Sequence, residues 1–143
     1  MPAVSLAHLF DAELHHQPGM PPIAPDGEGE LIGSGDGVLR GDRLEGTFRW
    51  TLFEQRGALV CSMNPILAIV TGDGAKLTVE GRGYGRRERP DDSLWRVAAT
   101  LLFDTDDERY AWLNGRLALW EGGFDAERHR ASYRAYIPSA PTP

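Results

Sequence analysis

The sequence predicts an all-β fold, a closed antiparallel barrel or sandwich of about eight short strands with one short helix. Through most of the chain apolar and polar residues alternate with a period of two, as in strands that bury one face. Glycine-containing turns separate these runs at regular intervals, with Gly-Asp at 41–42 and Gly-Asp-Gly at 72–74. The chain has 143 residues, 41% of them hydrophobic and 25% charged, which fits one domain with one core.

The N-terminal part contains one ambiguous segment and one loop. The segment VSLAHLFDAELHH (4–16) fits neither the helical nor the strand period cleanly, and its length permits a helix. The segment QPGMPPIAPDGEGE (17–30) is rich in proline and glycine and predicts a loop before the main body.

The main body contains the clearest strands. In GVLRGDRLEGTFRWTLFE (37–54), Phe48, Trp50 and Leu52 share one face. The run 58–83 turns at 71–74 and contains Pro65, which we expect only at a bulge or an edge because proline has no N–H for the ladder. Three later runs also predict strands: LWRVAATLLF (94–103), GRLALWEG (115–122) and RHRASYRAYI (128–137).

The stretch DTDDERYAWLNG (104–115) carries the best helix signal. Thr105 or Asp106 can cap the first turn, and acidic residues follow where they favour the helix dipole. Asn114-Gly115 then ends the turn, so we predict one short helix near 106–114. The last residues, PSAPTP (138–143), predict a disordered tail, which leaves residues 1–137 as a single domain.

Charge and composition exclude several classes of function. The net charge of −6 argues against a nucleic-acid partner, since such domains are usually basic. The single cysteine allows no intramolecular disulfide, and the histidines show no spaced ligand motif, so we expect no metal and no cofactor. No basic region precedes an apolar run at the N-terminus, and no run approaches the roughly 18 apolar residues of a membrane span. We therefore expect a cytoplasmic protein without a membrane partner.

The stretch ERYAWLNGRLALWEGGFDAERHRASYRAYI resembles the domain-of-unknown-function family DUF 3237, a family of small bacterial and fungal barrels. Further matches are GDRLEGTF (41–48), GDGAKLTVEGRG (72–83) and the pair Trp95-Arg96. The resemblance extends over residues 5–137 and implies a lipocalin-like up-and-down barrel. Because SLAHLFDAEL resembles the family's first strand, it also favours a strand in the first segment. It implies no activity, since the family is uncharacterised.

The resemblance points to three candidate site residues. Arg82 and Arg96 match arginine positions of the family, and an arginine inside a barrel could bind a carboxylate, an enolate or a phosphate. The alternative is an ordinary ion pair with a neighbouring acidic side chain. Asn64 falls where many members carry an aspartate, so any chemistry that needs this carboxylate is in doubt here.

The other candidates are aromatic or polar residues with two interpretations each. Trp112 and Asn114 could stack on and hydrogen-bond a ligand at the barrel mouth. Alternatively, the short helix closes the barrel end, with Trp112 as its core side chain and Asn114 bonded to backbone. Trp50 and Trp120 could line the lumen or simply pack in the core.

Three functional hypotheses follow. The first is a barrel that binds a small, largely apolar or aromatic organic molecule with a carbonyl or carboxylate group. The candidate ligand-binding residues are Trp50, Asn64, Arg82, Arg96, Trp112, Asn114 and Trp120. The second is a cofactor-free lyase, isomerase or cyclase for a carbonyl-containing, secondary-metabolite-like substrate, with Tyr84, Tyr136 or Asp104 moving a proton. The third is a filled barrel with a structural or homo-oligomeric role. An enzyme requires a titratable side chain with a perturbed pKa inside the cavity.

Overall fold

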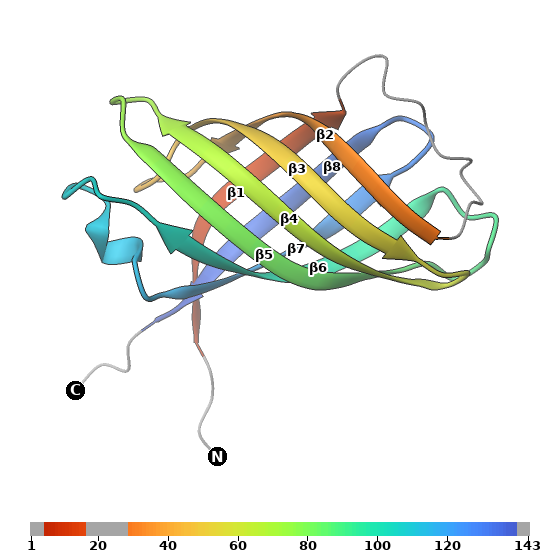
Figure 1. Cartoon of the computed structure of the whole chain (residues 1–143). Coiled ribbons are helices and arrows are strands. Elements are labelled where there is room, and N and C mark those ends of the chain that lie inside the picture. Colours follow the sequence, from red (N-terminus) through yellow and green to blue (C-terminus); the bar gives the residue numbers. More distant parts are fainter. Residues whose placement is uncertain (1–4, 17–28, 140–143) are drawn as a thin grey trace.

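The alternating segments of the sequence form the strands of a closed barrel (Figure 1). The computed structural model describes residues 5–16 and 29–139. Its strands are β1 (Leu6–His16), β2 (Gly29–Arg40), β3 (Gly46–Arg56), β4 (Val60–Thr71), β5 (Lys76–Arg86), β6 (Leu94–Asp104), β7 (Leu117–Asp125) and β8 (Arg130–Pro138). Each strand pairs antiparallel with the next, and β8 pairs with β1 to close the barrel. The predicted all-β up-and-down barrel is confirmed, and the first segment is a strand.

The short helical element is a 3-10 turn, η1 (Ala111–Leu113), between β6 and β7. Most of the predicted loop, residues 17–28, and most of the predicted tail, residues 140–143, lie outside the described residues. Gly29 and Glu30 belong to β2, and Pro138 belongs to β8. The described part of the chain contains no helix long and apolar enough to cross a membrane.

Strand β4 shows how strictly the two faces are separated. Every second residue from Cys61 to Thr71 is buried, and the residues between them are exposed. Pro65 lies on the buried face in the middle of this strand, so its expected place at a bulge or an edge is wrong. The ladder between β4 and β5 instead omits the pairs of Asn64 and Pro65 without a shift in register. Gly81 faces the proline ring there, and a Cβ on it would lie 2.6 Å from Cγ of Pro65.

Aromatic rings inside the barrel lie against glycines of the neighbouring strands. The inward positions of β2 include Gly35 and Gly37, which are covered by the rings of Trp50 and Phe48. A Cβ on Gly35 would lie only 2.8 Å from Cζ2 of Trp50. The glycines of GRGYG (81–85) likewise face inward on β5, so this run has a packing role. The rings therefore lie along the wall of the barrel.

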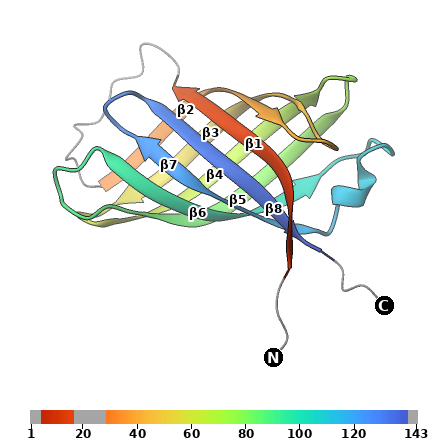
Figure 2. The ribbon, with the colours of Figure 1, turned by 180° about the vertical axis from the view of Figure 1, so that it is seen from behind.

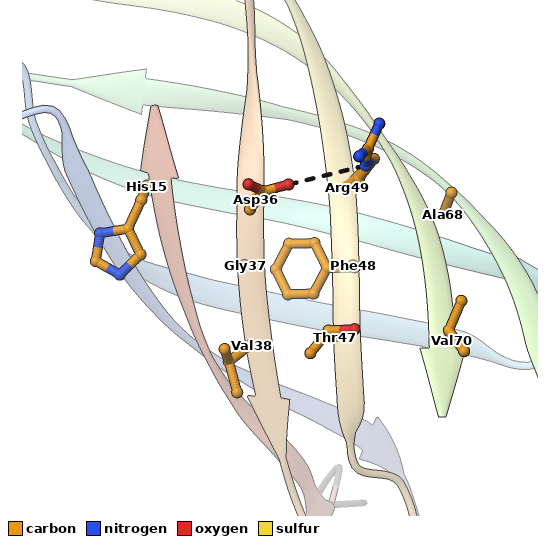
Figure 3. A pocket seen from close by; sticks show the side chains of 9 residues that line it. All are labelled: His15, Asp36, Gly37, Val38, Thr47, Phe48, Arg49, Ala68 and Val70. Carbon is orange, nitrogen blue, oxygen red and sulfur yellow. Dashed lines mark ion pairs between the residues drawn. The ribbon is translucent and has the colours of Figure 1, made fainter. Parts of the chain in front are cut away.

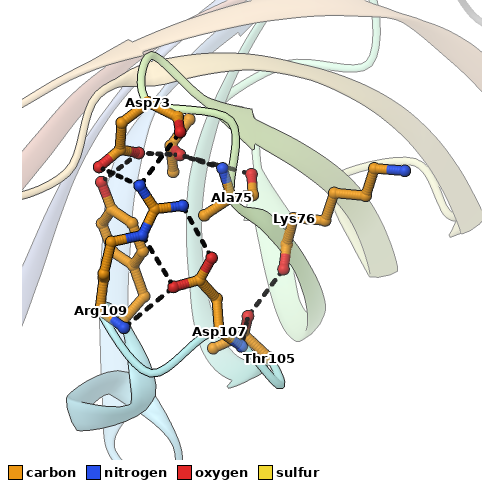
Figure 4. A network of polar contacts seen from close by, with 8 residues as sticks. Asp73, Ala75, Lys76, Thr105, Asp107 and Arg109 are labelled. Atoms are coloured by element: carbon orange, nitrogen blue, oxygen red, sulfur yellow. Dashed lines mark hydrogen bonds and ion pairs between the residues drawn. The ribbon is translucent and has the colours of Figure 1, made fainter.

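The two ends of the barrel are built differently (Figures 1 and 2). One end, here called the η1 end, carries the β2–β3, β4–β5 and β6–β7 connections. At this end Arg109 donates to the Asp107 carboxylate at 2.9 Å and approaches the Asp73 carboxylate at 3.1 Å (Figure 4). Tyr110 also donates to Asp73, so the β4–β5 turn is fastened to the segment before η1. The opposite end carries the β3–β4, β5–β6 and β7–β8 connections.

Candidate functional site

An ion pair lies inside the barrel near the opposite end. Glu54 and Arg56 continue the inward face of β3 that begins with Phe48 and Trp50, so alternation turns two charged residues into the barrel. Glu54 is 8% exposed and Arg56 is 7% exposed. Nη2 of Arg56 donates to Oε2 of Glu54 at 3.1 Å. Charges this deeply buried are retained in proteins only when they are paired.

The indole of Trp95 brings two guanidinium groups together. Cζ of Arg56 lies 5.3 Å from its ring centroid, and Cζ of Arg87 lies 4.4 Å from it. Arg87 also donates from Nε to the carbonyl of Ala58 at 2.7 Å, which ties the β5–β6 and β3–β4 connections together. A cation over an indole face is attracted to it, so Trp95 positions both arginines.

A second aromatic pair also lies inside the barrel. The rings of Trp120 on β7 and Tyr133 on β8 are stacked, with centroids 4.3 Å apart and an interplanar angle of 17°. Tyr133 lies over Gly122, where a Cβ would come within 2.8 Å of its Cδ1 atom. The glycine therefore makes room for the ring. We call Glu54, Arg56, Trp95, Trp120 and Tyr133 the interior cluster.

Burial perturbs the titratable groups of this region. Burial raises the pKa of the Glu54 carboxyl, and the charge and hydrogen bond of Arg56 oppose this only in part. Burial, the Glu54 charge and the Cys61 sulfur raise the pKa of the Tyr133 phenol. Burial, with the Glu54 charge adding to it, raises the pKa of the Cys61 thiol to about 11. Near neutral pH the phenol and the thiol therefore keep their protons.

Three buried N–H groups of the interior cluster have no acceptor among the described residues. They are Nε of Arg56, Nε1 of Trp95 and Nε1 of Trp120. The large majority of buried polar groups in proteins find a partner, and such exceptions often mark functional sites or bound water. All three groups can only donate, so a partner for any of them would have to be a hydrogen-bond acceptor.

His16 lies at the end of β1, beside this cluster. Its ring contacts Trp50, Phe124 and His129, with centroid distances of 4.9, 5.1 and 5.6 Å. Burial lowers the pKa of His16, a hydrogen bond to the backbone of His129 partly opposes this, and electrostatic repulsion from the side chains of His129 and Arg56 lowers it further. No group of three or more side chains suited to holding a metal ion occurs among residues 5–16 and 29–139.

The structure separates the predicted site residues. Trp120 belongs to the interior cluster, and Trp50 lies inside the barrel, where Nε1 donates to the Asp36 carbonyl at 3.1 Å. Asn64, Arg82 and Arg96 point outward from β4, β5 and β6 and are exposed. The three outward residues therefore do not meet the two tryptophans.

Trp112 and Asn114, the predicted site residues at η1, belong to the segment that closes this end of the barrel. Asn114 joins both ends of its amide to Thr105, accepting from the backbone N–H at 3.0 Å and donating to the carbonyl at 2.8 Å. The fully buried core side chain is Leu113, whereas Trp112 is half-buried under the guanidinium of Arg43, 3.6 Å from its ring. This favours the interpretation of η1 as a closure, with Leu113 in the role expected for Trp112.

The sequence analysis missed the two charged members of the interior cluster. Their signal was the face they share, because Glu54 and Arg56 have the same parity as Phe48 and Trp50. A run of apolar inward positions that ends in an acid and a base is unusual for a barrel core. Tyr133 lies in the run predicted as the last strand, and nothing else in the sequence distinguishes it.

Two hollows lined by described residues lie on the outer wall. The larger, of about 510 Å³, lies over β1 to β4 and is lined mainly by small and apolar side chains (Figure 3). Its ion pair joins Asp36 and Arg49 at 3.9 Å, and both side chains are more than 80% exposed. The smaller, of about 360 Å³, lies over β1, β7 and β8. Neither hollow contains a buried polar group that lacks a partner, so the interior cluster is the stronger candidate.

Solved structures share this fold over nearly the whole chain. A β-barrel-like protein from Acinetobacter baumannii is 17% identical, with a TM-score of 0.77 over 97% of this chain and 98% of that one. A protein of unknown function from Rhodopseudomonas palustris is 17% identical, with a TM-score of 0.75 over 97% and 100%. An enzyme from Penicillium herquei is 23% identical, with a TM-score of 0.65 over 97% and 98%.

The closed antiparallel barrel of this chain is thus a fold that it shares with proteins of unknown function and with a fungal enzyme. At such identities these likenesses show the fold alone. No family model and no curated protein matches the sequence. The resemblance to DUF 3237 therefore stays a prediction.

Proposed function

We propose that the barrel binds a small, largely apolar organic molecule through one carbonyl or carboxylate oxygen at the interior cluster. The observation that carries this proposal is the set of three buried N–H donors without an acceptor among the described residues. A ligand oxygen between Arg56 and the indoles would satisfy donors that otherwise remain desolvated. Arg56 suits this task because its guanidinium binds Glu54 through Nη2 and still has Nε to offer.

The aromatic side chains support a flat ligand. Trp95 and the stacked pair of Trp120 and Tyr133 present apolar surface next to the donors. Binding sites for organic molecules commonly combine mainly apolar walls with a few polar groups that orient the ligand. A flat molecule with one oxygen function fits that combination.

One observation favours the second hypothesis, a cofactor-free enzyme in the same site. The cluster contains a carboxyl and a phenol whose pKa values are both raised by burial, and perturbed groups of this kind are typical of acid–base chemistry. A filled structural barrel has less support, because it would leave the donors of Trp95 and Trp120 permanently unsatisfied.

Calorimetric titration with 2-tetralone, a flat bicyclic ketone, tests the binding proposal. The double variant Glu54→Gln/Arg56→Met removes the arginine donor without leaving a buried charge unpaired. We expect it to weaken binding about tenfold or more, as for the loss of a hydrogen bond to a charged group. The control Arg96→Met changes an exposed arginine and should bind like the wild type. No binding by the wild type, or equal affinity in both variants, would overturn the proposal.

A further inference from the structure

We propose that Glu54 is a general base that removes a proton from the carbon next to the ligand's carbonyl group, so that the barrel catalyses keto–enol isomerisation. This inference rests on the proposed function, because it acts on the molecule bound at the interior cluster. It goes further by assigning a reaction, a catalytic residue and a substrate class.

Among the residues that the structure describes, four titratable groups other than arginines lie in or beside the cluster, and three of them are poorly suited to take up a proton. Cys61 and Tyr133 already carry protons near neutral pH, because burial raises the pKa of both. Burial lowers the pKa of His16, which makes its imidazole a weaker base, and the ring is packed among Trp50, Phe124 and His129. This leaves Glu54 as the base of the cluster.

The carboxylate of Glu54 has one oxygen to spare. Arg56 holds Oε2 at 3.1 Å, whereas Oε1 accepts no hydrogen bond from any residue that the structure describes. The pair to Arg56 favours the ionised form of the carboxyl, against the effect of burial, and holds it on strand β3. Burial makes this carboxylate a stronger base than one in water, and proton transfer by a positioned carboxylate is a common catalytic step.

The same guanidinium can stabilise the product of proton removal. Nε of Arg56 is an unsatisfied donor, and the indole N–H of Trp95 is another on a ring 5.3 Å from the guanidinium carbon. When a C–H bond next to a carbonyl breaks, negative charge develops on the carbonyl oxygen. Fixed donors aimed at such an oxygen lower the barrier most when they are shielded from water, as these are.

The proposed step balances without a co-reactant. Oε1 of Glu54 takes the proton as the C–H bond breaks, and the electron pair forms a C=C bond while the carbonyl π electrons move to oxygen. Arg56 and Trp95 hold the enolate oxygen. The protonated Glu54 then returns its proton to the oxygen or to a carbon of the enolate. The net reaction is an isomerisation.

The chemistry of the base selects the substrate class. A carboxylate, even one with a raised pKa, removes protons effectively only from carbons that an adjacent carbonyl and a second activating group make acidic. A flat aryl or 1,3-dicarbonyl ketone meets this condition and matches the aromatic lining. A simple aliphatic ketone has no second activating group and no flat ring to pack against the aromatic side chains.

Deuterium exchange tests the inference with the protein as it is. We would follow by proton NMR the loss of the C1 protons of 2-tetralone in D2O with wild type, Glu54→Gln and Glu80→Gln. Glu80 is an exposed glutamate on β5, so it serves as the matched control. We expect exchange to fall about a hundredfold or more in Glu54→Gln, while the dissociation constant for 2-tetralone changes little and Glu80→Gln behaves like the wild type.

Two further readouts separate catalysis from structure. Glu54→Asp keeps a carboxylate but shortens the side chain by one methylene group. It should therefore retain a faster deuterium exchange of 2-tetralone than Glu54→Gln does. The wild-type rate should rise with pH as Glu54 ionises, and this profile should vanish in Glu54→Gln. Binding without exchange, or equal exchange in wild type and Glu54→Gln, overturns the inference and leaves the proposed function standing. Failure of the wild type to bind 2-tetralone overturns both.

Discussion

Arg56 is the residue on which the interior cluster depends most. It neutralises Glu54 through Nη2, lies over the face of Trp95 and keeps Nε as an unsatisfied donor. Its loss would remove the partner of a carboxylate that is 8% exposed. Breaking a buried pair on one side is far more harmful than replacing both partners, because the remaining charge stays desolvated.

We therefore predict that Arg56→Met lowers the free energy of unfolding by about 3–5 kcal/mol. The double variant Glu54→Gln/Arg56→Met should recover most of this loss, since no buried charge remains. Urea unfolding of the wild type and both variants measures the difference. Equal stability of the single and double variants would show that Glu54 is neutral or hydrated without Arg56.

Cys61 should be almost inert toward thiol reagents in the folded protein. Its pKa of about 11 leaves roughly one molecule in a thousand as thiolate at pH 8, and the side chain is 2% exposed. We expect reaction with Ellman's reagent at pH 8 to be slow without denaturant and fast in urea. A rapid reaction of the native protein would contradict the burial of this sulfur.

At the scale of single residues, the sequence predicts which residues share a face but not which face is inside. Alternation places neighbours such as Trp95 and Arg96 on opposite faces, yet it does not show which of the two points into the barrel. The deciding information is the pairing of distant strands, which brings Trp95 towards Arg56. For the same reason Asn64 and Arg82 could be proposed as site residues although both are exposed.

Among the elements, β7 offers a direct test of the packing of rings on glycine. Gly122 and Gly123 are adjacent, but a Cβ on Gly122 would meet the Ser132 carbonyl and the ring of Tyr133, whereas one on Gly123 would first meet Leu94 Cδ1 at 3.5 Å. We predict that Gly122→Ala lowers the free energy of unfolding by about 1–3 kcal/mol, as overpacking does. Gly123→Ala should change it by less than about 0.5 kcal/mol.

Urea unfolding of the two alanine variants measures these differences. Near-ultraviolet circular dichroism should also change in Gly122→Ala, because the Trp120–Tyr133 stack must shift. Equal stability of the two variants would mean that β8 can move away from β7 without a penalty.

The segment before β7 depends on one amide. Asn114 makes both of its hydrogen bonds to the backbone of Thr105. We predict that Asn114→Ala lowers the free energy of unfolding by about 1–2 kcal/mol, through two hydrogen bonds of modest net value. Asn64→Ala, at an exposed site on β4, should change it by less than about 0.5 kcal/mol. Thermal unfolding of both variants measures the difference, and similar melting temperatures would contradict this role of Asn114.

The strands were predictable as elements, whereas the exact form of η1 was not. Alternation and glycine turns report strands locally, because each strand has one buried face. The predicted cap at Thr105 or Asp106 does not cap this turn, because η1 begins only at Ala111 and its N-cap, Tyr110, makes no side-chain capping bond. Thr105 and Asp107 instead accept backbone N–H groups in the segment before η1. The turn then ends at Asn114, which is extended with ψ of 133°.

At the scale of the whole molecule, closure of the barrel was beyond local patterns. A sandwich and a barrel share the same strands, and they differ in the pairing of β1 with β8, which joins residues more than a hundred positions apart. The resemblance to DUF 3237 implied this closure, and the structure has it. The interior cluster also depends on closure, because its members come from β3, β6, β7 and β8.

Closure of the barrel brings His16, at the end of β1, against residues of distant segments, so we expect the stability of the barrel to depend on the protonation of His16. The surroundings of this ring, which include Trp50, Phe124, His129 and Arg56, lower its pKa below the ordinary 6.5. A lowered pKa in the folded state means that stability is present above the unfolded pKa and is lost as pH falls through the folded value. Glu54 acts in the opposite sense, because its raised pKa favours the folded state at low pH and this contribution is lost as pH rises.

We predict that, as the pH falls from 7.5 to 5.5, the free energy of unfolding of the wild type decreases relative to that of His16→Gln. The difference between the two proteins isolates His16 from Glu54, which both proteins retain. His15→Gln is the matched control, because His15 is the neighbouring residue on β1 and points outward from the barrel. Urea unfolding at the two pH values measures all three proteins. An equal change in the free energy of unfolding in wild type and His16→Gln would contradict this prediction. It would mean that the His16 ring takes up a proton in the folded barrel as readily as in the unfolded chain, so that its contact with His129 opens without a cost in free energy.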